Sequence, residues 1–227
     1  MDFAQSFVKL LNTLTDYVKE VCKDRNDSHG LNHMLHVTMN AHQILQNDDN
    51  DLFEESLGET YLYISIVAML HDVPDHKYDL DGTLHTQVFE FVRDKIIFDT
   101  EKAQFIMDII DHLSFSKENK AIQSGNPINY VEVLGDFGAY IRDIVSDADK
   151  LEALGEIGLY RCIEFTKHTY KEKYGKEISN KLLKQKVIEH ANEKLLRLKD
   201  EFFRTNYGTF LAIPLHDELI KAINEMP

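Results

Sequence analysis

The sequence predicts an all-α protein folded as a single-domain helical bundle. Apolar residues recur every three to four positions through most of the chain, as a helix needs when one face packs on a core. Strand-like alternation of apolar and polar residues is scarce. Four prolines and ten glycines occur among 227 residues, and no linker or repeat marks a second domain. We expect one domain over residues 1–227, with the motifs at about 26–170 and C-terminal helices at 178–226 packing on them.

The first helix is expected at residues 3–21, where apolar side chains lie at helical spacing. The same period returns at 53–70, 83–97, 100–113 and 178–203. Three polar stretches separate these helices, at 26–32, 73–82 and 114–129. The last is long enough to form a flap over a site, although an ordinary surface connection is the default for such a stretch.

Length and charge limit the classes of function. A chain of this length buries about 70% of the surface that its unfolded form exposes, so it needs no disulfide or structural metal. Acidic residues outnumber basic ones 39 to 25, which gives a formal net charge of -14. We therefore expect no polymeric nucleic acid as a partner, and a small anionic substrate would need local cations.

Cysteine usage and the N-terminus indicate a cytoplasmic protein. Cys22 and Cys162 lie in helix-patterned segments without a CxxC spacing, as expected for free thiols in a reducing compartment. The N-terminus lacks a basic segment followed by an apolar run and a cleavage site, and no run approaches a membrane span. We expect no membrane partner.

The pair His71-Asp72 closes the most apolar run of the chain, residues 61–70. Pro74 follows and blocks continuation of the helix. Two strong metal ligands therefore emerge where a buried helix stops, and we expect the pair to line a cavity.

Other histidines share this placement at the junction of a helix and a loop. The chain has eleven histidines, and four lie at such junctions: His29, His33, His71 and His112. Together with the carboxylates of Asp72 and Asp149, they can surround one divalent ion. Such a donor set suits Mn, Fe, Co, Ni or Zn better than calcium.

Two aspartates, Asp147 and Asp149, stand in the segment SDADKLEALGEIG at the expected start of a helix, where capping also favours carboxylates. Residues two apart on a helix face about 200° away from each other. We therefore expect one ligand and one capping or supporting group, and we assign Asp149 as the ligand.

The ordered set of His33, the pair His71-Asp72 and the late aspartate Asp149 resembles the signature of the HD superfamily of metal-dependent phosphohydrolases. Five blocks, SHGLNHMLHV, AMLHDVPDHKY, IIDHLSFS, IVSDADKLEALGEIGLYR and EKLLRLKDEFFRT, follow in order the small single-domain bacterial HD nucleotide pyrophosphohydrolases. The resemblance covers residues 26 to about 211.

The resemblance implies an all-helical fold with one divalent metal ion, Mn, Co, Ni, Fe, Zn or Mg. It implies four ligands: His33, His71, Asp72 and Asp149. A metal in such a site lowers the pKa of a bound water toward ~7 and polarises a phosphoryl oxygen, so water can serve as the nucleophile.

The resemblance also implies roles for residues near the ligands. Asp75 matches a catalytic acidic residue of related pyrophosphohydrolases and is assigned as the base or as a group that orients water. Lys77 would offer a charge to phosphate, and the alternative is a solvated loop lysine. His112 would bind a phosphate oxygen or act as general acid, and the alternative is a structural histidine.

The first block departs from the family pattern His-Asp-x-x-His-x-x-Arg-Val. This chain has Gly30 after His29, and His36 in place of the arginine. An imidazole replaces that arginine as a substrate contact only partly, because it lacks the bidentate fork. Arg161 matches an arginine of the GIGxxR segment, and Arg142 is a further cation near the site blocks. For both arginines, the alternative is an ion pair with a carboxylate.

These residues predict a metal-dependent phosphohydrolase of a small phosphorylated metabolite, above all a nucleotide. The reaction would cleave a pyrophosphate linkage or a terminal phosphomonoester. A different class of function is a metal- or nucleotide-binding sensor module with little catalysis, which the histidine at position 36 motivates. A third is an HD oxygenase with two irons, which would need additional histidine ligands.

Overall fold

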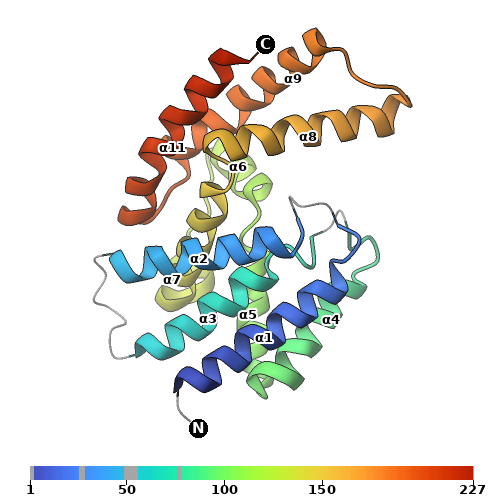
Figure 1. Ribbon diagram of the computed structural model, residues 1–227. Helices are drawn as coiled ribbons and strands as arrows, with labels where there is room; N and C mark the ends of the chain where they lie inside the picture. The colour runs from blue at the N-terminus through green and yellow to red at the C-terminus, as the bar shows by residue number, and fades with distance from the viewer. Residues whose placement is uncertain (1–2, 26–28, 49–55, 76–77, 227) are drawn as a thin grey trace. The chain divides into compact units, whose positions relative to one another are not determined.

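The computed structural model describes residues 3–25, 29–48, 56–75 and 78–226 (Figure 1). All regular structure in these ranges is helical, which confirms the all-α fold. The chain forms two compact units, Met1–Gln46 with Asn50–Ser146, and Asn47–Asp49 with Asp147–Pro227. The single domain expected over residues 1–227 stays a prediction. Among the described helices, none combines the length and apolarity that a membrane span requires.

The first unit holds the helices that precede residue 147. They are α1 (Phe3–Val21), α2 (Leu31–Asn47), α3 (Leu57–Leu70), α4 (Thr83–Phe91) with its π-helical continuation η2 (Val92–Ile97), α5 (Thr100–Asp111), α6 (Phe115–Gln123) and most of α7 (Tyr130–Leu151). Helix α3 packs against α1 and α5, as the ribbon shows (Figure 1). The helices expected at 3–21, 83–97 and 100–113 are confirmed within a few residues.

Helix α3 is the centre of this unit. Every residue from Tyr63 to Leu70 is buried, so this part of the helix is enclosed on all sides by its neighbours. It ends at Leu70, and His71 to Pro74 form a turn. The predicted stop before Pro74 is therefore confirmed, because proline cannot continue the hydrogen-bonding pattern of a helix.

The polar stretch 114–129 is not a loop throughout. Helix α6 begins after Ser114, whose hydroxyl oxygen accepts the N–H of Lys117 at 3.4 Å and caps the helix. Glu118 of this helix is buried. The stretch therefore contains an ordered helix with one side chain in the interior.

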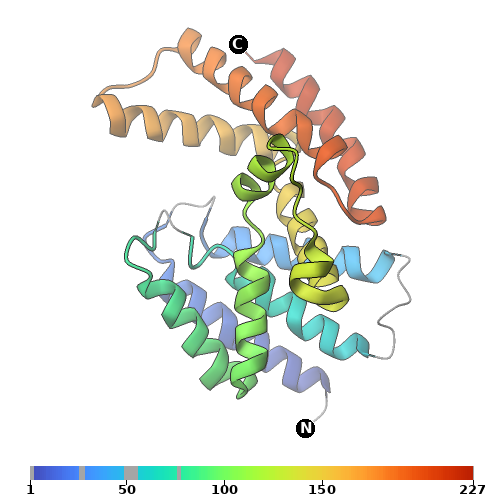
Figure 2. The same ribbon diagram turned by 180° about the vertical axis from the view of Figure 1, so that it is seen from behind.

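The second unit consists of α8 (Gly155–Tyr174), α9 (Asn180–Glu193), the short η3 (Leu195–Arg197) and α10 (Leu198–Glu201), and α11 (Asn206–Glu225). Helix α8 packs against α9 and α11, and the view from behind shows the same three helices (Figure 2). The continuous helix expected at 178–203 is broken at Lys194, where the backbone leaves helical geometry at φ -129° and ψ -67°.

The helix start expected near Asp147 is wrong. Helix α7 continues through this position to Leu151, because buried Ile144, Val145 and Ala148 extend its apolar stripe. Asp147 does support a cap, but that of another helix, α11, whose cap residue is Thr205. The Oδ2 atom of Asp147 accepts the backbone N–H of Thr205 at 2.7 Å and the Thr205 hydroxyl at 2.8 Å, next to the start of α11.

Gly208 in the first turn of α11 is required by this arrangement. A Cβ atom there would lie 2.5 Å from the Thr205 hydroxyl oxygen and 2.8 Å from Asp147 Oδ2. A larger residue would therefore displace the cap.

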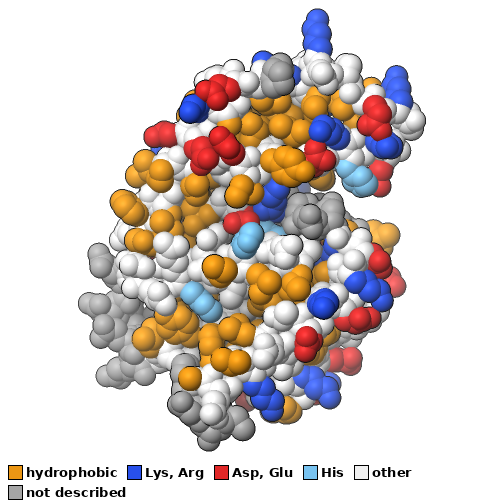
Figure 3. All heavy atoms as spheres, in the orientation of Figure 1, with side chains coloured by type: hydrophobic (Ala, Val, Ile, Leu, Met, Phe, Trp, Pro, Cys, Tyr) orange, Lys and Arg blue, Asp and Glu red, His pale blue; other side chains and the backbone are white. Residues whose placement is uncertain are grey.

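The face seen in Figure 3 carries acidic and basic side chains side by side, with apolar side chains between them. No broad basic surface is visible on that face, in keeping with the formal net charge of -14.

Burial raises the pKa of Asp147 from its ordinary 3.8 to about 6, although Lys150 and the hydrogen bonds from Thr205 and Arg204 act in the opposite direction. Between about pH 4 and 6, the native state therefore binds more protons than the unfolded state, and the free energy of unfolding falls as the pH rises. We expect this loss to reach roughly 3 kcal/mol relative to Asp147→Asn. Chemical denaturation with a chelator present measures it, and parallel pH curves for the two proteins would contradict it.

Candidate metal centre

The ends of α2 and α3 bring His33 and His71 together in the first unit. His33 lies in the first turn of α2 and is 3% exposed, and His71 directly follows α3. Their ring centroids are 5.3 Å apart. The Nδ1 atom of His71 lies 2.8 Å from the Ala68 carbonyl oxygen, so Nδ1 carries the proton and the lone pair is on Nε2. This is the tautomer that binds a metal through Nε2.

The carboxylate of Asp72 faces both imidazoles. Its Oδ2 lies 3.7 Å from His33 Nε2, and its Oδ1 lies 3.8 Å from His71 Nε2. A third imidazole, that of His29, has Nδ1 only 2.7 Å from Oδ2. The fold thus brings together His33, His71 and Asp72, with two imidazole nitrogens and one carboxylate as donors. This set fits Mn, Fe, Co, Ni or Zn.

Arg25 is a residue of this region that the sequence analysis missed. Its guanidinium donates to the backbone carbonyls of Asp72, at 2.6 Å, and of Val73, at 2.7 Å. The same group lies 4.1 Å above the ring of Tyr78. Arg25 therefore satisfies the two backbone carbonyl groups that follow the end of α3.

Asp75 lies in the turn after the dyad. Its N–H donates to the Asp72 carbonyl at 3.3 Å, and its own carbonyl accepts the N–H groups of Tyr78 and Asp79. The backbone thus folds back on itself three residues after the ligand candidate Asp72. Lys77 lies outside the described residues.

His36 and His33 are on the same helix but differ in exposure, since His36 is exposed and His33 is buried. The position that carries an arginine in the family pattern is thus on the surface of α2.

His112 directly follows α5 as its C-terminal cap residue. Its Nδ1 lies 2.7 Å from the Asp108 carbonyl oxygen, so this nitrogen carries the proton and Nε2 bears the lone pair. The side chain is half-buried, and its ring centroid is 6.3 Å from that of Tyr130.

The second unit holds the remaining predicted residues. Asp149 is half-buried in the last turn of α7. Because Asp147 supports the cap of α11, Asp149 is the member of the pair that stays a ligand candidate. Arg161 donates to the Glu152 carbonyl at 3.2 Å and lies 3.8 Å from the Glu152 carboxylate, which is the ion pair weighed as its alternative.

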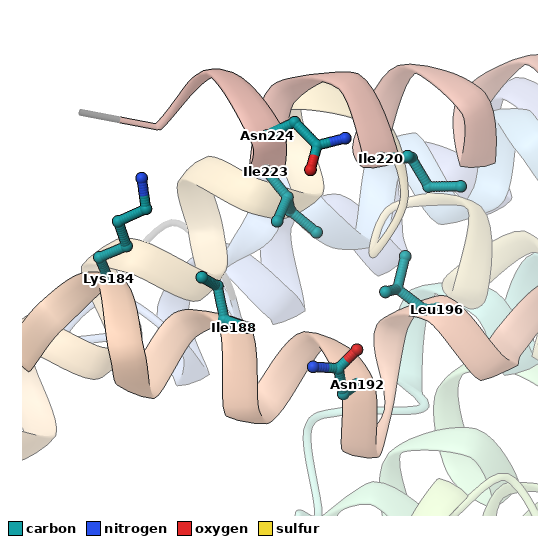
Figure 4. A pocket seen from close by; sticks show the side chains of 7 residues that line it. All are labelled: Lys184, Ile188, Asn192, Leu196, Ile220, Ile223 and Asn224. Carbon is teal, nitrogen blue, oxygen red and sulfur yellow. The ribbon is translucent and has the colours of Figure 1, made fainter.

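A hollow of about 360 Å³ lies between α9 and α11 in the second unit (Figure 4). Its lining is Lys184, Ile188, Asn192, Leu196, Ile220, Ile223 and Asn224. No histidine or carboxylate lines it, so it offers no donor set for a divalent metal.

Comparisons with known proteins extend over almost the whole chain. No family model matches it. YpgQ of Bacillus subtilis is 27% identical over 222 residues, which are 96% of this chain and 93% of that protein. Protein L803 of Acanthamoeba polyphaga mimivirus is 27% identical over 167 residues, which are 72% of this chain and 64% of the viral protein.

Solved structures share the fold. The crystal structure of YpgQ in complex with ADP has a TM-score of 0.63 at 22% identity and covers 97% of this chain and 94% of its own. An HD-superfamily hydrolase of Bacillus thuringiensis has a TM-score of 0.64 at 21% identity, with 97% and 95% covered. At this level of identity the likeness shows a shared fold, the all-helical fold that the sequence predicts.

Replacing Arg25 with methionine tests the hold of this residue on the turn after α3. Methionine keeps apolar contact with Tyr78 but cannot donate to the two carbonyls, so we expect the free energy of unfolding to fall by about 2 kcal/mol. The matched control is Lys23→Met, which removes an exposed ion pair with Glu20 and should change the free energy by less than about 1 kcal/mol. Urea denaturation gives both values. Equal effects of the two substitutions would show that the Arg25 contacts add no stability.

Proposed function

We propose that this protein is a metal-dependent phosphohydrolase acting on a small phosphorylated metabolite, above all a nucleotide. The observation that carries the proposal is the convergence of His33 and His71 on the carboxylate of Asp72, with both Nε2 atoms within 4 Å of its oxygens. Two buried imidazole nitrogens beside one carboxylate form a donor set that divalent metal ions use in catalytic sites.

In this proposal, His33, His71 and Asp72 hold one divalent ion, Mn, Co, Ni, Fe, Zn or Mg, and Asp149 is the fourth ligand. The assignment of Asp149 rests on the resemblance to the HD superfamily and on the role of Asp147 in supporting the cap of α11. When bound, the ion activates a water molecule and polarises a phosphoryl oxygen.

The other predicted residues act on the water and the substrate. Asp75 takes a proton from the attacking water or orients it. The Nε2 atom of His112 bonds a phosphate oxygen or, when protonated, gives its proton to the leaving oxygen. Lys77, His36 and Arg161 supply the contacts to phosphate that an acidic protein needs around an anionic substrate.

The preference for a nucleotide has separate support. YpgQ, which is similar to this chain over nearly its full length, has been crystallised in complex with ADP. The choice between cleavage of a pyrophosphate linkage and of a phosphomonoester depends on which phosphate reaches the ion, and product analysis decides it.

A second candidate is a metal- or nucleotide-binding module with little catalysis. The observation in its favour is the imidazole of His36, exposed on α2 where the family pattern has an arginine. Hydrolysis of a nucleotide by the wild-type protein would contradict this second candidate function. An inert wild type together with hydrolysis by His36→Arg would support it.

Activity is the first test. Purified protein with Mn, Co or Ni should release phosphate or pyrophosphate from at least one member of a panel of nucleoside mono-, di- and triphosphates. We expect His71→Ala and Asp72→Ala to lower kcat by roughly a thousandfold or more, because each removes a donor to the activating ion. His168→Ala, an exposed histidine paired with Glu172 on α8, is the matched control and should keep full activity. A wild type inert toward the whole panel with every metal would refute the proposal.

Metal affinity tests the ligand set without catalysis. Calorimetric titration with Mn should show one ion per chain, and Asp72→Asn and Asp149→Asn should each weaken binding at least tenfold. Asp136→Asn, exposed on the same helix as Asp149, is the control and should bind like the wild type. Unchanged affinity in Asp149→Asn would remove this residue from the ligand set.

A further inference from the structure

Arg142 on α7 is a fully buried cation whose partners, among the residues that the structure describes, belong to the segment 112–130 or are its own neighbour Asp143. We infer that Arg142 is a positioning residue for His112, and that it fixes the segment 112–130, which carries helix α6. The inference rests on the proposed function, in which His112 contacts the substrate.

The contacts of Arg142 use every edge of the guanidinium. Its Nε donates to the His112 carbonyl at 3.0 Å. One terminal nitrogen donates to the Glu118 carboxylate at 2.8 Å and to the Tyr130 hydroxyl at 3.0 Å. The other terminal nitrogen donates to Asp143 at 2.9 Å, and the plane stacks 3.8 Å from the Tyr130 ring.

These partners mark the beginning, the middle and the end of one stretch of chain. His112 directly follows α5, Glu118 lies in α6, and Tyr130 begins α7. A single side chain therefore fixes the stretch at three points. Only a planar group with several donors in a fixed geometry can do this, so a lysine at the same position would lose most of the contacts.

The ion pair between Arg142 and Glu118 is buried, so its geometry must compensate for the loss of hydration of two charges. The side chains of Arg142 and Glu118 are 0% and 3% exposed. Two charges are tolerated out of water only when their geometry satisfies both, because the cost of removing them from water offsets much of their attraction. The gain from this pair is thus a defined geometry of the 112–130 stretch.

The contacts of Arg142 restrain the position of His112 in particular. Its backbone lies at the end of α5, with φ -103° and ψ 13°, where a helix is prone to fray. Arg142 holds the carbonyl, and the Asp108 carbonyl holds the Nδ1 proton. With both ends of the residue fixed, the direction of Nε2 is set before substrate binds. Without Arg142, the carbonyl is released and the imidazole can turn away or change tautomer.

The test compares Arg142→Lys with Arg93→Lys, which changes an exposed arginine paired with its neighbour Asp94. With Mn bound and a hydrolysed nucleotide from the panel, Arg142→Lys should lower kcat by about 10- to 100-fold, while KM changes by less than about threefold. Affinity for Mn should stay at the wild-type value, because Arg142 touches none of the proposed ligands. Arg93→Lys should match the wild type in all three quantities.

A second readout does not depend on turnover. Long-range ¹H–¹⁵N NMR spectra of the His112 imidazole should show the Nδ1-protonated tautomer in the wild type and a mixture in Arg142→Lys. Glu118→Gln keeps the shape of the partner but removes its charge, so it should show a smaller change in the same direction. This variant replaces Arg142→Lys in the measurement if Arg142→Lys does not fold.

The outcomes distinguish a failure of the proposed function from a failure of the positioning role of Arg142. An inert wild type refutes the proposed function, and the His112 spectra then still decide the positioning role. Wild-type kcat in Arg142→Lys, or an unaltered His112 tautomer in both variants, would overturn the inference. Loss of Mn affinity in Arg142→Lys would also overturn it, since the effect would then pass through the ligand set.

Discussion

The burial of α3 from Tyr63 to Leu70 is the constraint on which the candidate site depends. Because every residue from Tyr63 to Leu70 is enclosed, the helix cannot slide or turn without exposing apolar surface. The position of its last residue is therefore fixed, and His71 and Asp72 follow it directly. Arg25 adds a second restraint by holding the carbonyls of Asp72 and Val73. His71 and Asp72 thus lie in a turn, but the rigid helix before them fixes its position.

The polar residues that the sequence singles out divide into candidates for action on a substrate and groups that hold others in place. Asp147 and Asp149 show the division most clearly, since they are two residues apart on one helix. Asp147 is buried and binds the start of α11, whereas Asp149 stays a candidate ligand. His29 and Arg142 are further supporting groups, one against the carboxylate of Asp72 and one against the carbonyl of His112.

The sequence predicts the parts of this structure that depend on local pattern. The apolar run at 61–70 and Pro74 are enough to place the end of α3, and the order of His33, His71 and Asp72 indicates one site. Contacts between distant positions leave no such pattern. Arg25 meets carbonyls 47 and 48 residues away, and nothing in its surroundings in the sequence indicates this.

Two expectations near the site show how composition misleads. Arg204 and Thr205, which donate to Asp147 just before α11, lie 57 and 58 residues beyond it, so the sequence suggested a cap for the nearest expected helix instead. The stretch 114–129 is rich in turn-forming residues, yet the buried pair of Glu118 with Arg142 supports a helix within it. Both errors arise because buried polar partners, and not local propensity, decide these segments. The roles of Asp149, Asp75 and His112 stay predictions.

The most direct test of the account is a crystal structure of the Mn-loaded protein with a nonhydrolysable nucleotide, with data collected at the manganese absorption edge. The account predicts one anomalous peak in contact with His33 Nε2, His71 Nε2 and the Asp72 carboxylate, with a phosphate oxygen of the nucleotide beside it. A nucleotide bound elsewhere, or no peak at these three residues under saturating Mn, would contradict it.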